Sequence, residues 1–214
     1  MNYNYYHDEA LETIARKVIS QYNPALLKEP SPIPIEDIME RVYGLTLEYH
    51  YLRKNERVLG ETVFADVNVP IYEPQNNRYK LIPVKAGTVI IDVRLLQKPN
   101  DGRFRFTCAH ELAHWVIDRK YFIRIDETAA LTSATAEEMT KTVAISSNTN
   151  ALIERQANRM ASRLLMPKCT LKPAYHHARS KLPSMAAVLT HLADLYEVSK
   201  QAMQIRLEEM GLTT

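Results

Sequence analysis

Cysteine is scarce in this chain: Cys108 and Cys169 are the only two among 214 residues. Two thiols provide no disulfide framework, which excludes the small secreted domains that depend on one. Long hydrophobic runs are missing too, and without about 18 consecutive apolar residues no segment is expected to cross a membrane. The N-terminal residues lack the basic start and the apolar core of a signal peptide, so we expect a cytoplasmic protein.

An excess of charge of one sign is also absent. The formal net charge is +2, which is too small to indicate a nucleic-acid or membrane partner. Apolar residues make up 46% of the chain and charged residues 24%, proportions that are typical of a globular protein and exclude a disordered one. A chain of this length forms one domain, or one domain with a small appendage.

Residues 110–114 read His-Glu-Leu-Ala-His, the spacing of a zinc-binding helix. Side chains four residues apart lie one turn apart on the same helical face, so His110 and His114 can reach one ion. Glu111 projects from a neighbouring face, where it can act as general base on a water molecule instead of binding the metal. Apolar neighbours predict a buried helix that begins between residues 103 and 107. The motif predicts a zinc hydrolase site; the alternative is a pair of core histidines bonded to backbone groups.

A catalytic zinc ion takes three protein ligands and leaves one position open, so a third ligand is needed. Glu154 is our choice, because it lies on a predicted helix, 153–166, whose face carries small residues that permit close packing. Asp118 is excluded as a ligand because about 12 Å of helical rise separates it from His110. Glu137 and Glu138 lie in a polar segment and are expected to be solvated.

Hydrophobic periodicity predicts an α+β fold, in which a small, mostly antiparallel sheet packs against a helical bundle that carries the zincin-like helix. Two further helices are expected: one at 8–22, with Asp8 as its N-cap, and one at 35–42, with Gly44 after its end. Strands are expected at 45–51, 59–65, 80–84 and 88–92. Residues 67–77 are expected to form a loop or an irregular hairpin. Residues 119–150 are expected to form a long loop with one helix near 134–143.

The C-terminal residues predict a helix pair with the rhythm of a helix-turn-helix. Its helices are expected at 185–196 and 200–210, capped by Ser184 and Ser199. We expect this pair to belong to a helical subdomain, residues 171–214, packed on the domain that carries the proposed zinc site, residues 1–170.

The helix pair supports an alternative function, a DNA-binding regulator with little or no catalytic activity. Its second helix contains only Lys200 and Arg206 as bases, few for phosphate contacts, so direct binding of nucleic acid is not expected.

The two halves of the proposed site together resemble the ImmA/IrrE family of metallopeptidases. The matching segments are 106–114, 154–167, the strand at 89–92 and the end at 198–207. The resemblance implies a zinc metalloendopeptidase that cleaves a helix-turn-helix repressor and so relieves repression of stress or mobile-element genes. The chain departs from the family pattern in its long 119–150 segment, and in Met160, where a phenylalanine is usual.

Other residues are assigned less specific roles. Tyr175, His176 and His177 are candidates for stabilising the oxyanion, the alternative being that they belong to an ordinary loop. Cys108 is expected to pack in the core, and Cys169 to lie in a loop after Pro167. No pattern in the sequence indicates the oligomeric state or the substrate.

Overall fold

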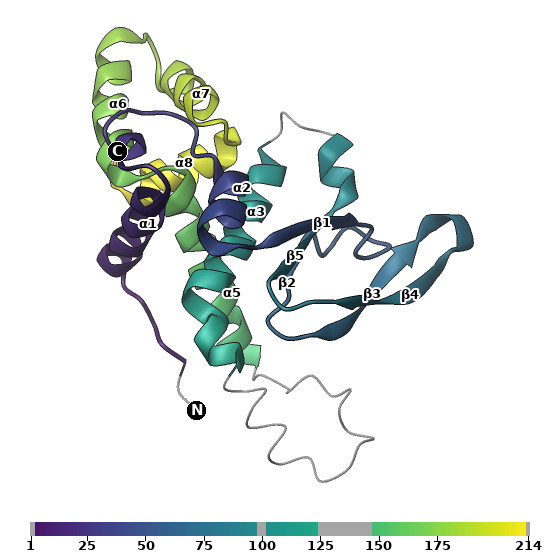
Figure 1. Ribbon diagram of the computed structural model, residues 1–214. Helices are drawn as coiled ribbons and strands as arrows, with labels where there is room; N and C mark the ends of the chain where they lie inside the picture. Colours follow the sequence, from purple (N-terminus) through teal and green to yellow (C-terminus); the bar gives the residue numbers. More distant parts are fainter. Residues whose placement is uncertain (1–2, 98–101, 124–146, 213–214) are drawn as a thin grey trace.

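The computed structural model describes residues 3–97, 102–123 and 147–212 of the chain. Helices form one side of the molecule, and a small sheet with a projecting hairpin forms the other (Figure 1). This arrangement confirms the predicted α+β fold.

The helices lie close to their predicted positions in most of the chain. They are α1 (Asp8–Tyr22), α2 (Ile35–Asp37), α3 (Arg103–Ala113), α5 (Ser147–Leu165), α6 (Lys168–Lys181), α7 (Met185–Tyr196) and α8 (Lys200–Glu209). A π-helical segment, η2 (Ile38–Val42), continues α2, and Gly44 follows its end with a φ of 64°. A second π-helical segment, η5 (His114–Asp118), continues α3 from the last residue of the His-Glu-Leu-Ala-His motif.

The central sheet has three strands in the order β1 (Thr46–His50), β5 (Thr88–Asp92), β2 (Gly60–Thr62). β2 pairs with β5 antiparallel, but β1 pairs with β5 in parallel. The sheet is therefore mixed, since the long connection between β1 and β5 leaves room for the crossover that a parallel pair needs. Alternating side chains predict a strand without predicting the direction of its neighbour.

A separate antiparallel hairpin projects from the sheet side of the molecule (Figure 1). It pairs β3 (Val67–Glu73) with β4 (Arg78–Val84). Of the two predictions for residues 67–77, the loop is wrong for 67–73, and the irregular hairpin is right as a hairpin but wrong in its irregularity, because the two strands pair in one continuous register. Tyr72 and Tyr79 face each other across the two strands, which helps to hold this exposed ribbon together.

β5 is buried on both faces and joins two hydrophobic cores. Val89 and Ile91 pack in the main core with the helices, while Ile90 packs on the opposite face with a smaller core beneath the hairpin. Because successive side chains of a strand point to opposite faces, this one strand fixes the sheet between the helices and the hairpin.

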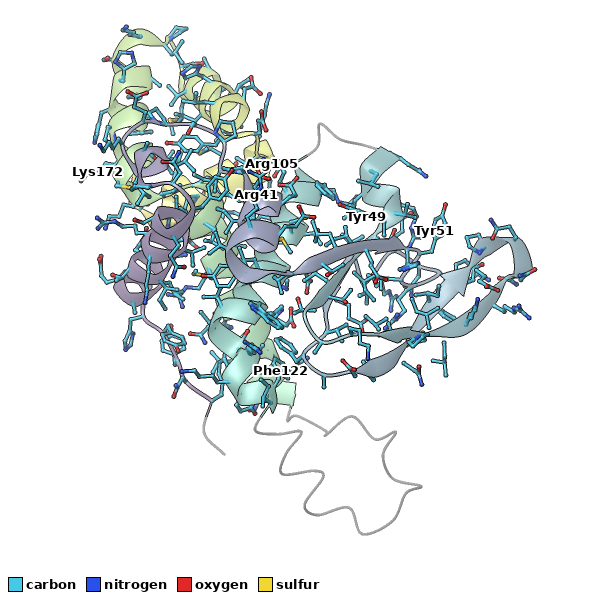
Figure 2. All side chains as sticks on the ribbon, viewed as in Figure 1. Arg41, Tyr49, Tyr51, Arg105, Phe122 and Lys172 are labelled. Carbon is cyan, nitrogen blue, oxygen red and sulfur yellow. The ribbon has the colours of Figure 1, made fainter. Side chains whose placement is uncertain are left out.

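The start of α3 is tied to two other parts of the helical body. Arg105 donates to the carbonyl oxygen of Ile33 at 2.8 Å and lies 3.6 Å from the carboxylate of Glu197, at the end of α7 (Figure 2). Tyr49 of β1 stacks on Phe104, with ring centroids 6.4 Å apart. These contacts hold the metal-motif helix against both the sheet and the C-terminal helices.

Two local predictions are wrong. Asp8 does not cap α1, because His7 holds the N-cap position, and the Asp8 carboxylate instead pairs with Arg159 and Arg163 of α5. Residues 168–181, which include Cys169 and the three oxyanion candidates, form a helix and no loop. Pro173 lies inside that helix, and because proline usually interrupts a helix, the sequence indicated a loop. The side chains of Leu171, Tyr175 and Ala178 recur at helical spacing, and their burial holds the helix in place.

Most of the 119–150 segment lies outside the described residues. Residues 119–123 continue the metal-motif helix and residues 147–150 begin α5, so the loop prediction is wrong at both ends. Glu137, Glu138 and the helix expected near 134–143 fall in the part that is not described.

Ser184 and Ser199 cap α7 and α8 as predicted, accepting hydrogen bonds from the backbone N–H groups of Ala187 at 3.2 Å and Ala202 at 3.1 Å. The expected boundary between residues 170 and 171 lies within α6, and the division into two units stays a prediction.

Within residues 3–97, 102–123 and 147–212, none of the helices combines the length and the apolar character that crossing a membrane requires.

Candidate metal centre

The two halves of the predicted site meet where α5 packs against α3. Alanines allow this close approach, because small side chains let two helices come together. Ala109 and Ala113 of α3 and Ala157 and Ala161 of α5 are all fully buried. The alanine-bearing face predicted for α5 therefore packs as expected, and it brings Glu154 over the histidine pair.

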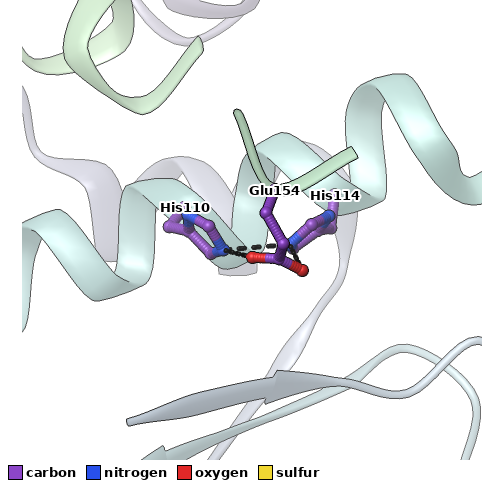
Figure 3. Close-up of side chains that lie close together, drawn as sticks. All are labelled: His110, His114 and Glu154. Carbon is purple, nitrogen blue, oxygen red and sulfur yellow. Dashed lines mark hydrogen bonds and ion pairs between the residues drawn. The ribbon is translucent and has the colours of Figure 1, made fainter. Parts of the chain in front are cut away.

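His110, His114 and Glu154 converge on one point (Figure 3). The Nε2 atoms of the two histidines are 3.0 Å apart. One carboxylate oxygen of Glu154 lies 3.2 Å from Nε2 of His110, and the other lies 3.8 Å from Nε2 of His114. Ligand atoms from three side chains thus lie within 4.8 Å of one another.

The spacing of these atoms fits a zinc ion. Ligand atoms bound tetrahedrally at about 2.0–2.1 Å lie about 3.3 Å apart. The Nε2 atoms of the two histidines, 3.0 Å apart, and the Glu154 oxygen that lies 3.2 Å from Nε2 of His110 are close to that spacing. Two imidazoles and one carboxylate are a ligand set that catalytic zinc uses. The side chain of Glu154 is 49% exposed, which leaves the carboxylate side of the cluster accessible to water.

Each histidine binds a second polar group through its other ring nitrogen. Nδ1 of His110 lies 3.0 Å from Oδ1 of Asn158, and Nδ1 of His114 lies 2.8 Å from Oδ2 of Asp118. Such partners fix the orientation of an imidazole and leave Nε2 free for a metal. Asp118 is thus not one of the three converging residues, and it contacts the ring nitrogen of His114 that faces away from them, as the support of that histidine.

Negative charge surrounds the histidines. Burial lowers the pKa of His114, but the hydrogen bond with Asp118 and the charges of Glu111, Asp118 and Glu154 outweigh burial, so the pKa is raised. The hydrogen bond with His110 and the charges of both histidines lower the pKa of Glu154, against the opposing effect of burial. The shift of His114 describes an environment that favours a cation at its ring, and the shift of Glu154 keeps its carboxylate ionised.

Glu111 lies on the sheet side of the same helix, outside the three-residue cluster. It is buried, and the hydroxyl of Thr62 donates to its Oε2 at 2.7 Å. Gly60, two residues before Thr62 in β2, leaves room for this side chain, because a Cβ there would lie 2.4 Å from Oε1 of Glu111 and would displace it. β2 therefore holds the carboxylate in place from the side opposite α5.

A groove of about 940 Å³ extends from Glu154 between α3, α5 and α8. Its lining includes Phe106 of α3, Ala151 and Arg155 of α5, and Ala202 and Ile205 of α8. Ile205 is 48% exposed and contributes apolar surface to this groove. The outer face of α8 thus forms one wall of a groove that begins at Glu154.

The oxyanion candidates lie elsewhere. Tyr175 is buried in α6 and donates its hydroxyl to the carbonyl oxygen of Leu212, while His176 and His177 are exposed on the same helix. No contact among the described residues joins these three side chains to the histidine cluster, and their predicted role stays a prediction.

Sequence reasoning missed the groups that support the cluster. Asp118 stands four residues after His114, and Asn158 stands four residues after Glu154, so each lies one helical turn from a candidate ligand. That spacing was a usable signal for both residues. The sequence contains no comparable signal for Thr62 and Gly60, because nothing in it indicates which strand passes beside Glu111.

A comparison with solved structures finds a protein of similar fold. A solved structure of a Mycobacterium tuberculosis transcriptional regulator matches with a TM-score of 0.51 at 16% sequence identity, a likeness that shows a shared fold. The match covers 96% of this chain but 57% of the regulator, so the chain spans a little over half of that protein's length. Curated proteins provide no match.

The family model of the IrrE N-terminal-like domain, Peptidase_M78, matches residues 92–208. The match begins at the end of β5, includes His110, His114 and Glu154, and ends in α8. It confirms the family predicted from the two-part motif. The chain therefore belongs to the IrrE N-terminal-like domain family, Peptidase_M78.

Proposed function

We propose that the chain is a zinc-dependent endopeptidase that cleaves a regulatory protein, specifically a helix-turn-helix repressor. The convergence of His110, His114 and Glu154, with the Glu111 carboxylate held beside them, is the observation that carries this proposal. Family membership supports a metallopeptidase-like role, and the match to a transcriptional regulator supports a link to gene regulation.

In this proposal His110, His114 and Glu154 hold the zinc ion. When bound there, zinc supplies Lewis acidity toward the scissile carbonyl and the attacking water. Asp118 and Asn158 keep both imidazoles turned with Nε2 toward the ion. Glu111 takes the proton of the water at its carboxylate and returns it to the leaving amine, while the hydroxyl of Thr62 fixes the orientation of that carboxylate.

The groove beside Glu154 supports a peptide substrate. Its volume of about 940 Å³ is at the upper end of ligand pockets, which suits several residues of an extended or helical segment. Exposed Ile205 and half-buried Ala202 offer an apolar surface for a substrate side chain. In this role α8 binds protein and does not read DNA.

The alternative, autonomous DNA binding by α7 and α8, is disfavoured by the state of Arg206. Its guanidinium group is buried, pairs with Glu12 of α1 and donates to the carbonyl oxygen of Met166 at 3.2 Å. A buried, paired arginine is not available for a phosphate, so Lys200 is the base left on this helix. Gel shifts that weaken steeply with salt would instead support the DNA-binding function.

The proposal is tested by incubating the zinc-loaded chain with purified helix-turn-helix proteins from its own genome. We expect one of them to be cut at a defined bond, with cleavage abolished by a chelator and restored by zinc. A chain that binds zinc stoichiometrically and cuts none of them would contradict the proposed substrate class.

Gly60→Ala is expected to lower kcat/KM on the order of 10²-fold, because a misplacement of about 1 Å in a catalytic group has an effect of this size. The added methyl group would push the Glu111 carboxylate from its present position, since the clash involves its Cγ and Cδ as well as Oε1. Zinc affinity is expected to stay unchanged. Steady-state kinetics with zinc titrations on the same preparation measure both quantities; undiminished kcat/KM would show that β2 does not position Glu111.

Ile205→Arg is expected to raise KM on the order of 10-fold, because it removes one buried apolar contact with substrate worth about 1–3 kcal/mol. Gln204→Arg is the matched control: it adds the same side chain at the adjacent, exposed position of α8, outside the groove. Kinetics of the two variants side by side measure the difference. Equal KM values would mean that the groove does not bind the substrate.

A further inference from the structure

The N-terminal segment, residues 3–7, runs along α5 to the far end of the metal-motif helix. The side-chain amide of Gln156, a fully buried residue of α5, makes two hydrogen bonds to the backbone of this segment. Its Nε2 donates to the carbonyl oxygen of Asn4 at 2.9 Å, and its Oε1 accepts from the backbone N–H of Tyr6. The ring of Tyr3 packs edge-on against Tyr121, with centroids 5.2 Å apart. The segment is therefore an ordered part of the structure.

The hydroxyl of Tyr3 connects this segment with the metal centre. It donates to Oδ1 of Asp118, whose other oxygen lies 2.8 Å from Nδ1 of His114. It also accepts a hydrogen bond of 2.8 Å from the amide of Gln156. Asp118 has no exposed surface, so protein groups must satisfy its carboxylate.

The direction of each hydrogen bond follows from the chemistry of the groups. An amide N–H only donates, so the proton of the Tyr3 hydroxyl is left for the carboxylate. Burial, together with the hydrogen bond and charge of Asp118, raises the pKa of Tyr3, so the phenol keeps that proton. Asp118 thus receives one donor on each oxygen, Tyr3 on one side and His114 on the other.

We propose that Tyr3 is a positioning residue of the metal centre, whose hydroxyl fixes the Asp118 carboxylate that orients His114 toward the ion. The inference rests on the proposed metal centre. Without this hydroxyl one oxygen of a buried carboxylate loses its donor, and the carboxylate turns or admits water to replace it. His114 then loses the fixed direction of its Nδ1 partner, and Nε2 is held less firmly toward the other two ligands.

Tyr3→Phe tests this role, because it removes the hydroxyl and keeps the ring contact with Tyr121. Tyr5→Phe is the matched control: it also removes one phenolic hydroxyl from the same segment, but that hydroxyl accepts from Arg159 at 3.2 Å and does not reach Asp118. Zinc affinity of the full chain is measured by competition with a chromophoric chelator. The visible absorption of the cobalt-loaded chain reports the coordination geometry, and melting of the metal-free chain reports stability.

We expect Tyr3→Phe to weaken zinc binding on the order of 10-fold and to shift the cobalt bands, as for other groups that support a metal ligand. Tyr5→Phe is expected to change neither. Equal zinc affinities and cobalt spectra for the two variants, with tight binding by the unaltered chain, would overturn the inference alone. Absence of zinc binding by the unaltered chain would overturn the proposed metal centre and the inference with it.

Discussion

Replacement of Glu154 by alanine is expected to lower zinc affinity by more than about 100-fold, beyond the 10–100-fold effect of losing a supporting group. The variant loses one of three ligands and leaves two histidines whose Nε2 atoms, 3.0 Å apart, no longer have a carboxylate beside them. Peptidase activity is expected to fall with the metal. Because α5 is held by its buried alanines and by Gln156, the helix itself is expected to stay in place.

The matched control for this experiment is Arg155→Ala. Arg155 is the next residue of α5, is exposed and lines the groove, but has no contact with the cluster among the described residues. Zinc titrations can be followed by the fluorescence of the single tryptophan, Trp115, which stands beside His114. Full zinc occupancy in Glu154→Ala would show that the third ligand is another residue.

Glu111→Gln is expected to lower kcat on the order of 10²–10⁴-fold, the usual contribution of a general base, and to leave zinc binding intact. The amide has the same shape as the carboxylate, and its oxygen still accepts the hydrogen bond from Thr62. It has no basic oxygen for the proton of the water. The combination of bound metal and lost turnover is what separates a general base from a ligand.

Glu61→Gln provides the control for Glu111→Gln. It makes the same chemical change on the adjacent strand, where Glu61 lies 3.3 Å from Arg53 instead of beside the histidines. Single-turnover cleavage by the two zinc-loaded variants compares their chemical steps. A Glu111→Gln variant that cleaves as fast as Glu61→Gln would mean that another group accepts the proton.

The sequence predicted that His110, His114 and Glu154 come together, because local patterns on two helices indicate it. Spacing within one helix brings His110 and His114 to the same face, and the alanines of α5 indicate where another helix packs. Glu154 followed from these two patterns. The supporting role of Asp118 could have been read from its position one turn after His114, but Asp118 was considered only as a ligand. Tyr3 required the tertiary structure, because it lies near the N-terminus, far in the sequence from the helix that it contacts.

The predictions of the fold were wrong where tertiary contacts outweigh local sequence signals. Pro173 indicated a loop, yet the buried face of α6 keeps that segment helical. Asp8 is a good N-cap residue by type, but the arginines of α5 bind its carboxylate. The direction of β1 relative to β5 depends on how a long connection crosses the sheet, which periodicity does not encode.

The structure of the zinc-loaded chain, determined with anomalous diffraction at the zinc edge, would locate the metal and its ligands. We expect one zinc ion bound by Nε2 of His110, Nε2 of His114 and the carboxylate of Glu154, with a fourth position open to water. Zinc bound at a different place, or a fourth protein ligand that closes the coordination shell, would contradict a catalytic role for this centre.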